Sequence, residues 1–212
     1  MTTHAPLHGW VVVDLSTGIA GGYGTKMLAD GGAEVVKVEP PEGDPLRRWS
    51  ASGAAIAAGD DGALFQFLAS SKRSVVADPA QSADLAQVQD LLEGADAVVW
   101  TLGSRLAELG PLTPAALLAD HPHLTVTSIT PFGLEGPWRD RPATEFTLQA
   151  WSGGVIGLGR GDPERAPVFV GGRVGEWLAG AYGAVGTMVS HCGVRARGRS
   201  WTSRCSRRWP CA

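Results

Sequence analysis

A glycine-rich segment near the start of the chain is the first place where residue types and spacing suggest chemistry. Gly18, Gly21 and Gly24 stand at regular intervals between an apolar run and a segment that can form a helix. A tight turn at a helix N-terminus presents backbone N–H groups that bind anions such as phosphate. The segment is therefore a candidate phosphate-binding turn, although glycines of this kind also serve turns that bind nothing.

A dinucleotide fingerprint is a second interpretation of the same turn. The order of strand, turn and helix fits it, and Glu39 ends the next strand, where an acid can hold a ribose hydroxyl. The glycine spacing is G-x-x-G-x-x-G, whereas the fingerprint needs G-x-G-x-x-G. An NAD(P)-dependent oxidoreductase therefore stays open only as a remote alternative.

Basic side chains elsewhere in the sequence are candidates to assist such a turn. Lys72 and Arg73 precede a β-branched run, and Arg47 follows a Gly-Asp-Pro-Leu segment. Arginine and lysine both bind phosphate groups, so a pair near the turn would add to its attraction for an anion. The competing interpretation of Lys72 and Arg73 is an ordinary solvated pair at the start of a strand.

The elements that must position these residues alternate between strand and helix patterns. An apolar run over 10–15, a helix over 24–30 and a strand over 34–39 form a βαβ unit. The right-handed crossover rule makes the two strands parallel and puts the glycine-rich turn at the carboxyl edge of the first. Open α/β sheets bind their ligands at this edge.

The same alternation continues along the chain. Residues 42–62 show no period and predict a long surface loop. Further helices are expected over 63–69, 83–92, 105–109, 113–119, 145–152 and 174–189, and further strands over 74–77, 97–100, 124–130 and 168–170. This order predicts an α/β fold with a doubly wound, mostly parallel sheet.

Composition separates the end of the chain from the rest. The net charge of the 212 residues is −3, but residues 191–212 contain six arginines and no acid, which leaves −9 for the residues before them. The three cysteines also lie in this stretch, at spacings that match no zinc or disulfide pattern. These spacings predict no metal site. No apolar run is long enough for a membrane span, so a cytoplasmic protein is expected.

Two longer strings carry a resemblance to a known family. They are VDLSTGIAG at 13–21 and MLADGGAEVVKVEPPEGDPLR at 27–47, and shorter matches follow at 71–74, 94–99, 109–110, 128–137, 149–153 and 175–180. Over about residues 9–190 the chain resembles the opening of the family III CoA transferases, which include formyl-CoA transferase, carnitine CoA transferase and α-methylacyl-CoA racemase. The resemblance implies a large Rossmann-like domain that transfers coenzyme A from an acyl-CoA to a carboxylic acid.

The resemblance also implies the residues of the site. The nucleophile of the family is an aspartate that opens a helix after a glycine-rich segment, and Glu176 stands at that position. A carboxylate can attack a thioester to give a mixed anhydride and then an enzyme–CoA thioester. Glu145 matches the acid of the histidine–aspartate pair in the racemase branch, and Thr144 replaces the histidine, which favours transfer over racemisation. The implied CoA contacts are Thr17, Gly18, Ile19, Ala20, Arg47, Lys72, Arg73, Thr101 and Leu102.

The resemblance stops near residue 190, whereas members of the family continue further. We therefore expect residues 1–190 to be the N-terminal part of the large domain, and residues 191–212 to be an aberrant, disordered basic tail. GC-rich codons for 200–211, read one nucleotide earlier, can encode the family's continuation, so we hypothesise a frameshift near His191. Such a truncated chain could be a non-catalytic remnant that at most binds CoA. The resemblance implies homodimers for intact relatives, and no nucleic-acid or membrane partner is expected.

Overall fold

The described strands form one parallel sheet whose order reverses beside its first strand. The computed structural model describes residues 5–158, 164, 166, 168–197 and 203–204. The strands are β1 (Val11–Leu15), β2 (Glu34–Glu39), β3 (Lys72–Val76), β4 (Ala97–Thr101), β5 (Thr125–Ile129) and β6 (Ser203–Arg204). They lie in the order β3-β2-β1-β4-β5-β6, and each neighbouring pair is parallel. This order confirms the predicted doubly wound α/β fold and puts its switch point between β1 and β4.

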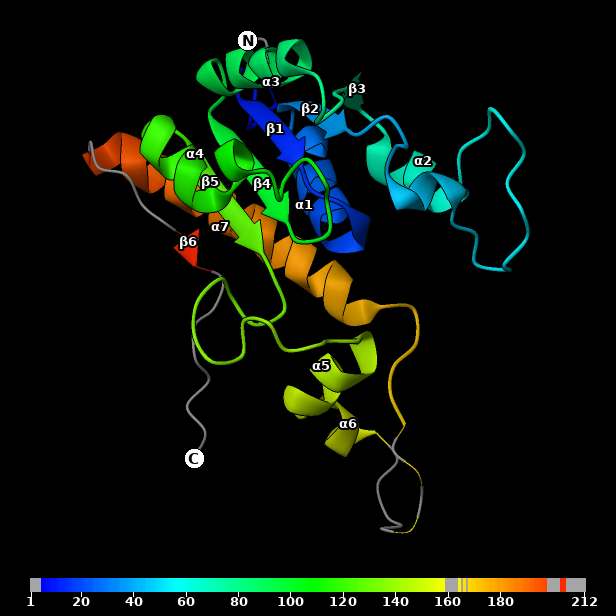
Figure 1. Ribbon diagram of the computed structural model, residues 1–212. Coiled ribbons are helices and arrows are strands. Elements are labelled where there is room, and N and C mark those ends of the chain that lie inside the picture. Colours follow the sequence, from blue (N-terminus) through cyan, green and yellow to red (C-terminus); the bar gives the residue numbers. More distant parts are fainter. Residues whose placement is uncertain (1–4, 159–163, 165, 167, 198–202, 205–212) are drawn as a thin grey trace.

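Helices cover both faces of the sheet. On one face, α1 (Gly18–Asp30) and α7 (Val174–Arg197) lie side by side (Figure 1). On the other face, α3 (Ser82–Glu93) and α4 (Pro114–Asp120) pack against β1, β4 and β5. The short helix α2 (Ala63–Ala69) packs beside α1. Each face of the sheet therefore has its own apolar core, as a buried parallel sheet requires.

Side-chain alternation in β1 divides its residues between these two cores. Val12 joins the core beneath α1 and α7, whereas Val13 and Leu15 join the core beneath α3 and α4. Successive side chains of a strand point to opposite faces, so Asp14 shares the face of Val12. Lys37 of β2 lies in register with Asp14, and both residues are buried. A pair of opposite charges thus occupies the core beneath α1.

Several predicted boundaries differ from the structure. α1 begins at Gly18 instead of residue 24, because packing against α7 and the sheet outweighs the low helix propensity of its glycines. Residues 105–109 form turns before the short 3-10 helix η2 (Gly110–Leu112), and residues 168–170 do not form a strand. The loop over 42–62 is long, as predicted, and contains the 3-10 helix η1 (Pro45–Arg48).

The segment between β5 and α7 leaves the body of the sheet. It contains α5 (Glu145–Trp151) and α6 (Gly154–Gly157), which lie well away from the strands (Figure 1). The chain then returns through α7, which continues past residue 190 to Arg197. None of the helices in the described part of the chain is long and apolar enough to cross a membrane.

Candidate active site

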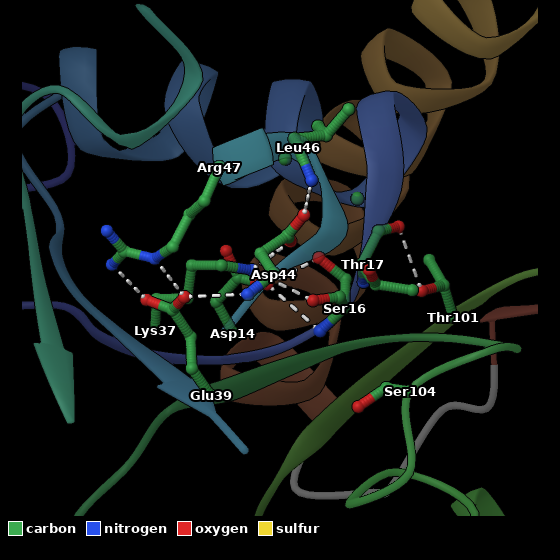
Figure 2. Close-up of polar contacts among 12 residues, drawn as sticks. Asp14, Ser16, Thr17, Lys37, Glu39, Asp44, Leu46, Arg47, Thr101 and Ser104 are labelled. Carbon is green, nitrogen blue, oxygen red and sulfur yellow. Dashed lines mark hydrogen bonds and ion pairs between the residues drawn. The ribbon is translucent and has the colours of Figure 1, made fainter. Parts of the chain in front are cut away.

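The glycine-rich turn lies at the switch point of the sheet. Thr17 is the N-cap residue of α1 and has an extended backbone, with φ −132° and ψ 159°. Its N–H donates a hydrogen bond of 2.8 Å to Oγ1 of Thr101, which ends β4 (Figure 2). Leu102 follows and is exposed. The structure therefore brings the predicted contacts of the first turn next to those of the loop after β4, in the crevice where such sheets bind ligands.

Backbone donors at the start of α1 are suited to an anion. The side chain of Thr17 does not cap the helix. Among the residues that the structure describes, no side chain accepts a hydrogen bond from the N–H groups of Gly18, Ile19 or Ala20. The first N–H groups of a helix lack intrahelical partners and carry the positive end of the helix dipole. A phosphate group placed here would find both charge and donors.

Asp14 anchors the turn from below. Its Oδ1 accepts hydrogen bonds from the N–H and the hydroxyl of Ser16, the first of them over 3.0 Å. Its Oδ2 accepts from Thr25 Oγ1 at 2.7 Å and from Lys72 Nζ at 3.2 Å. Burial by itself raises the pKa of Asp14, but Lys37 and Lys72, with the two hydroxyl groups, lower it to about 2. The carboxylate is therefore ionised and rigidly held.

Lys37 holds the same turn from its other side. Its Nζ donates to the carbonyl oxygen of Ser16 and forms an ion pair with Asp44, each over 2.9 Å (Figure 2). Burial by itself lowers the pKa of Lys37, but Asp14 and Asp44 raise it above the ordinary value. Asp14 and Lys37 therefore fix both polar groups of the Ser16 backbone, directly before the N-cap of α1.

Arg47, which is half-buried, and Glu39, which is buried, form a second ion pair beside the first. Arg47 Nε and Nη2 donate to the two oxygens of Glu39 at 2.7 and 2.8 Å, and Nη1 donates to Asp61 at 2.7 Å. Burial alone would raise the pKa of Glu39, but the bonds from Arg47, Ser74 and the Asp44 N–H lower it to about 2. Because both Glu39 oxygens are engaged and its side chain is only 2% exposed, it is poorly placed to hold a ribose hydroxyl. This weighs against the dinucleotide interpretation.

Lys72 and Arg73 are neighbours in sequence, but the structure separates them. Lys72 lies beneath α1, where its Nζ donates to the Gly22 carbonyl and to Thr25 Oγ1 over 2.9 and 2.6 Å as well as to Asp14. Burial lowers its pKa, and its side chain is 2% exposed. Arg73 is exposed and pairs with Glu34 at the start of β2. The ammonium group of Lys72 and the guanidinium groups of Arg73 and Arg47 do not lie open at the turn. The CoA contacts assigned to these three residues stay predictions.

Glu176 lies in the first turn of α7, as the sequence predicted. Arg173 Nε and Nη2 both contact its Oε1, at 2.8 and 2.5 Å. Its side chain is 24% exposed, so the carboxylate is partly accessible. A carboxylate of this kind is chemically able to act as a nucleophile.

Glu145 meets the same helix end from α5. It follows the N-cap Thr144, whose hydroxyl caps α5. Its Oε1 accepts a hydrogen bond of 2.6 Å from the Gly175 N–H and one of 2.8 Å from Gln149. Its Oε2 is buried and has no hydrogen-bond partner among the described residues. The structure therefore brings Glu145 and Glu176, the two predicted acids, to the start of α7.

A close helix crossing joins this helix end to the glycine-rich turn. A Cβ on Gly180 would lie 2.4 Å from the Ala20 carbonyl oxygen, so only glycine lets α7 approach the first turn of α1. Gly24 faces Gly180 in the same contact. One turn before Gly180, Trp177 packs edge-on against Tyr23 with ring centroids 4.9 Å apart. The first turn of α1 therefore lies directly against α7, about one helical turn from Glu176.

The positions of Asp14, Lys37, Asp44 and Arg173 were not identified from the sequence. Asp14 and Lys37 did leave a signal, because each is a charged residue within an otherwise apolar strand. Buried charges are rare unless they are paired, so two of them in adjacent predicted strands suggest an ion pair. Asp44 and Arg173 lie in loops, where no such pattern marks a charged residue. Their roles follow only from the contacts in the structure.

The fold and this pair of helix ends define an α/β domain with two carboxylates, Glu145 and Glu176, at the N-terminus of the helix that packs against α1. The sequence profile of CoA-transferase family III matches residues 7–206, and the chain belongs to that family. It is 35% identical over 181 residues to succinate–glutarate CoA-transferase of Agrobacterium fabrum, covering 84% of this chain and 44% of that protein. It is 32% identical to succinyl-CoA–D-citramalate CoA-transferase of Chloroflexus aurantiacus, covering 87% and 45%.

Solved structures give the same assignment. A CAIB/BAIF family protein from Brucella suis superposes with a TM-score of 0.82 at 30% identity, over 95% of this chain and 53% of that one. The chain thus spans about half the length of the relatives it matches. The predicted domain boundary at 190 stays a prediction, and the profile match continues beyond it.

Proposed function

We propose that this chain carries the CoA-binding and nucleophilic part of an enzyme that transfers coenzyme A from an acyl-CoA to a carboxylic acid. The observation that carries the proposal is the placement of Glu176, a partly exposed carboxylate at the N-terminus of α7, beside the anion-binding start of α1. The relatives named as CoA-transferases support the same activity.

The reaction needs only carboxylate and thiolate chemistry. A Glu176 oxygen attacks the thioester carbonyl, the C–S bond breaks, and CoA leaves as a thiolate from a mixed anhydride. The thiolate then attacks the Glu176 carbonyl, and the original acyl group leaves as a carboxylate. The incoming acid reverses both steps, so the energy of the thioester is conserved. Charge balances throughout, because each step exchanges one anion for another.

The start of α1 supplies the CoA-binding part. The N–H groups of Gly18, Ile19 and Ala20 would bind a phosphate of CoA, while Thr101 holds the turn in place. Leu102, exposed beside this turn, offers an apolar contact. The bulk of CoA would then extend from the turn toward Glu176, which lies one helical turn from the α1–α7 contact at Gly180.

Glu145 is proposed as an assisting acid. Its Oε1 accepts a hydrogen bond from one N–H group in the first turn of α7, that of Gly175, and its Oε2 is buried without a hydrogen-bond partner in the described ranges. A buried unpaired oxygen is costly unless something binds it. The substrate would supply this partner when it binds next to Glu176.

The experiment that tests the proposal is mass spectrometry of the chain after incubation with succinyl-CoA. A CoA thioester on Glu176 that hydroxylamine removes is expected, and Glu176→Gln should abolish it. Glu145→Gln is the comparison variant, because it replaces the neighbouring acid of α5 but leaves the nucleophile, so the adduct should form more slowly but should not disappear. CoA binding without any adduct would contradict the proposal and favour the second candidate, a non-catalytic chain that only binds CoA. The chain's half-length relative to the proteins it matches is the observation that keeps this candidate open.

The same proposal includes the assembly and the compartment. The substrates would be an acyl-CoA and a free carboxylic acid, and the working unit would be a cytoplasmic homodimer. Size-exclusion chromatography with light scattering measures the assembly directly. A monomer that still forms the Glu176 adduct would show that the homodimer is not needed for the first half of the reaction.

A further inference from the structure

Within the described part of the chain, Arg173 is the only residue that forms a hydrogen bond or ion pair with the Glu176 carboxylate. Both contacts from the Arg173 guanidinium go to a single oxygen of Glu176, Oε1. Oε2 therefore has no hydrogen bond or ion pair among the described residues. Arginine normally binds a carboxylate through both oxygens, in parallel. The observed geometry therefore holds Glu176 in place while one oxygen stays free to react.

The backbone of Arg173 is held in an unusual conformation. Its φ is 57°, in the left-handed region, and the preceding Gly172 has φ 75°. Residues with a Cβ seldom adopt this conformation, and they persist in it mainly at functional sites. In this conformation the Arg173 carbonyl accepts the Glu176 N–H at 3.0 Å while the guanidinium reaches back to the carboxylate. The turn thus folds one residue onto both the backbone and the side chain of Glu176.

The transfer reaction itself removes the charge that Arg173 binds. When Glu176 is acylated, first as an anhydride and then as a CoA thioester, it no longer carries a negative charge. In the second step the C–O bond of the anhydride breaks, and the negative charge appears on the released acid. The guanidinium, whose side chain is 45% exposed, then lacks a partner at the moment when a free carboxylate is formed. A guanidinium cannot lose its proton at ordinary pH, so it stays able to bind another anion.

We propose that Arg173 is the substrate-carboxylate-binding residue, which pairs with Glu176 in the resting enzyme and with the free acid once Glu176 is acylated. This inference rests on the function proposed above, because it assigns the acid-binding part of that site. Because Arg173 would pair with Glu176 in one state and with the free acid in the other, it would favour substrates that enter and leave the site as carboxylates.

A binding experiment tests Arg173 without turnover. Glu176→Gln removes the charge of Glu176 and so imitates its acylated state. Succinate should then bind roughly tenfold more tightly to Glu176→Gln than to the unaltered chain, as measured by calorimetry or ligand-observed NMR. The gain should vanish in the double variant Glu176→Gln with Arg173→Gly, since glycine adopts the left-handed conformation without strain and lacks the side chain that carries the guanidinium.

Matched controls separate the possible failures. Arg139→Gln removes an exposed arginine elsewhere and should leave succinate binding unchanged. Arg173→Lys keeps the charge and should retain part of the gain. Equal succinate affinity in Glu176→Gln and the unaltered chain would overturn the role of Arg173 even if the CoA adduct forms. Absence of the adduct together with a gain that depends on Arg173 would instead reject the transferase proposal and keep an acid-binding arginine.

Discussion

The two parts of the site use charged groups in opposite ways. Beneath the Thr17 turn, Asp14, Lys37, Asp44 and Lys72 have side chains at most 5% exposed, and their charged groups form several hydrogen bonds and ion pairs. At the start of α7, Glu176 is 24% exposed, and among the residues that the structure describes its carboxylate forms polar contacts only with Arg173. Dense contacts fix a backbone, whereas a single contact leaves an oxygen available.

The contrast separates supporting residues from reactive ones. A buried ion whose donors and acceptors are all used has no capacity left for a ligand, and removing one partner leaves another charge uncompensated. A partly exposed carboxylate can exchange its partner at little cost, because surface ion pairs contribute little to stability. We therefore expect substitutions in the first group to reduce stability and substitutions in the second to reduce chemistry.

The largest expected effect is on the buried group. Asp14→Asn should lower the free energy of unfolding by about 3 to 5 kcal/mol, because Lys37 and Lys72 lose their shared counter-ion. Glu176→Gln should lower it by less than about 1 kcal/mol. Urea unfolding of both variants measures the difference. Equal losses of stability in the two variants would break the distinction between the two groups.

The sequence predicted the framework of this comparison well. The βαβ opening, the parallel sheet and the turn at the carboxyl edge follow from apolar runs and glycine positions, because both are local patterns. The place of Glu176 at a helix start was also predicted, from a resemblance that includes its glycine-rich approach. Local pattern sufficed wherever one element and its turn determine the position of a residue.

Partners distant in sequence could not be predicted in the same way. Lys72 was expected at a ligand, but its contact with Asp14 joins residues 58 positions apart and depends on the register of three strands. Arg173 was not singled out, because its φ of 57° is a property of the folded turn and not of a residue pattern. A basic residue next to a strand looks the same in sequence whether its charge is free or already paired.

The helix crossing that joins the two groups gives the next largest effect. Gly180→Ala should lower the free energy of unfolding by about 2 to 3 kcal/mol, because its Cβ would overlap the Ala20 carbonyl oxygen. Gly193→Ala lies on the same helix with nothing within 4 Å of its Cβ, and should raise stability by about 0.5 to 1 kcal/mol. Thermal unfolding of the two variants compares them. A gain in Gly180→Ala equal to that in Gly193→Ala would show that helix propensity and not the crossing decides.

Acid should lower the free energy of unfolding through two buried carboxylates, Asp14 and Glu39. The pKa values of Asp14 and Glu39 fall from the ordinary 3.8 and 4.5 to about 2 in the folded chain. Between these values the unfolded chain binds more protons, so the free energy of unfolding falls as pH decreases from about 4.5 to about 2, by about 2 kcal/mol per carboxylate. Above this range both states are ionised and the contribution is constant. Urea titrations across the range should show a shallower pH dependence for Glu39→Gln, and an unchanged dependence would contradict the assignment.

The smallest expected effect is at Thr101, which holds the Thr17 turn at the ligand crevice. Thr101→Val keeps the shape of the side chain but removes the acceptor of the Thr17 N–H, which should cost about 1 kcal/mol of stability. Because that bond holds the N-cap of α1, the affinity for CoA should fall more than the rate of adduct formation at saturating acyl-CoA. Thr101→Ser keeps the hydroxyl and is the matched control. If Thr101→Val instead slows adduct formation and leaves the CoA affinity unchanged, Thr101 acts in the reaction and not in CoA binding. The turn would then belong to the reactive part of the site.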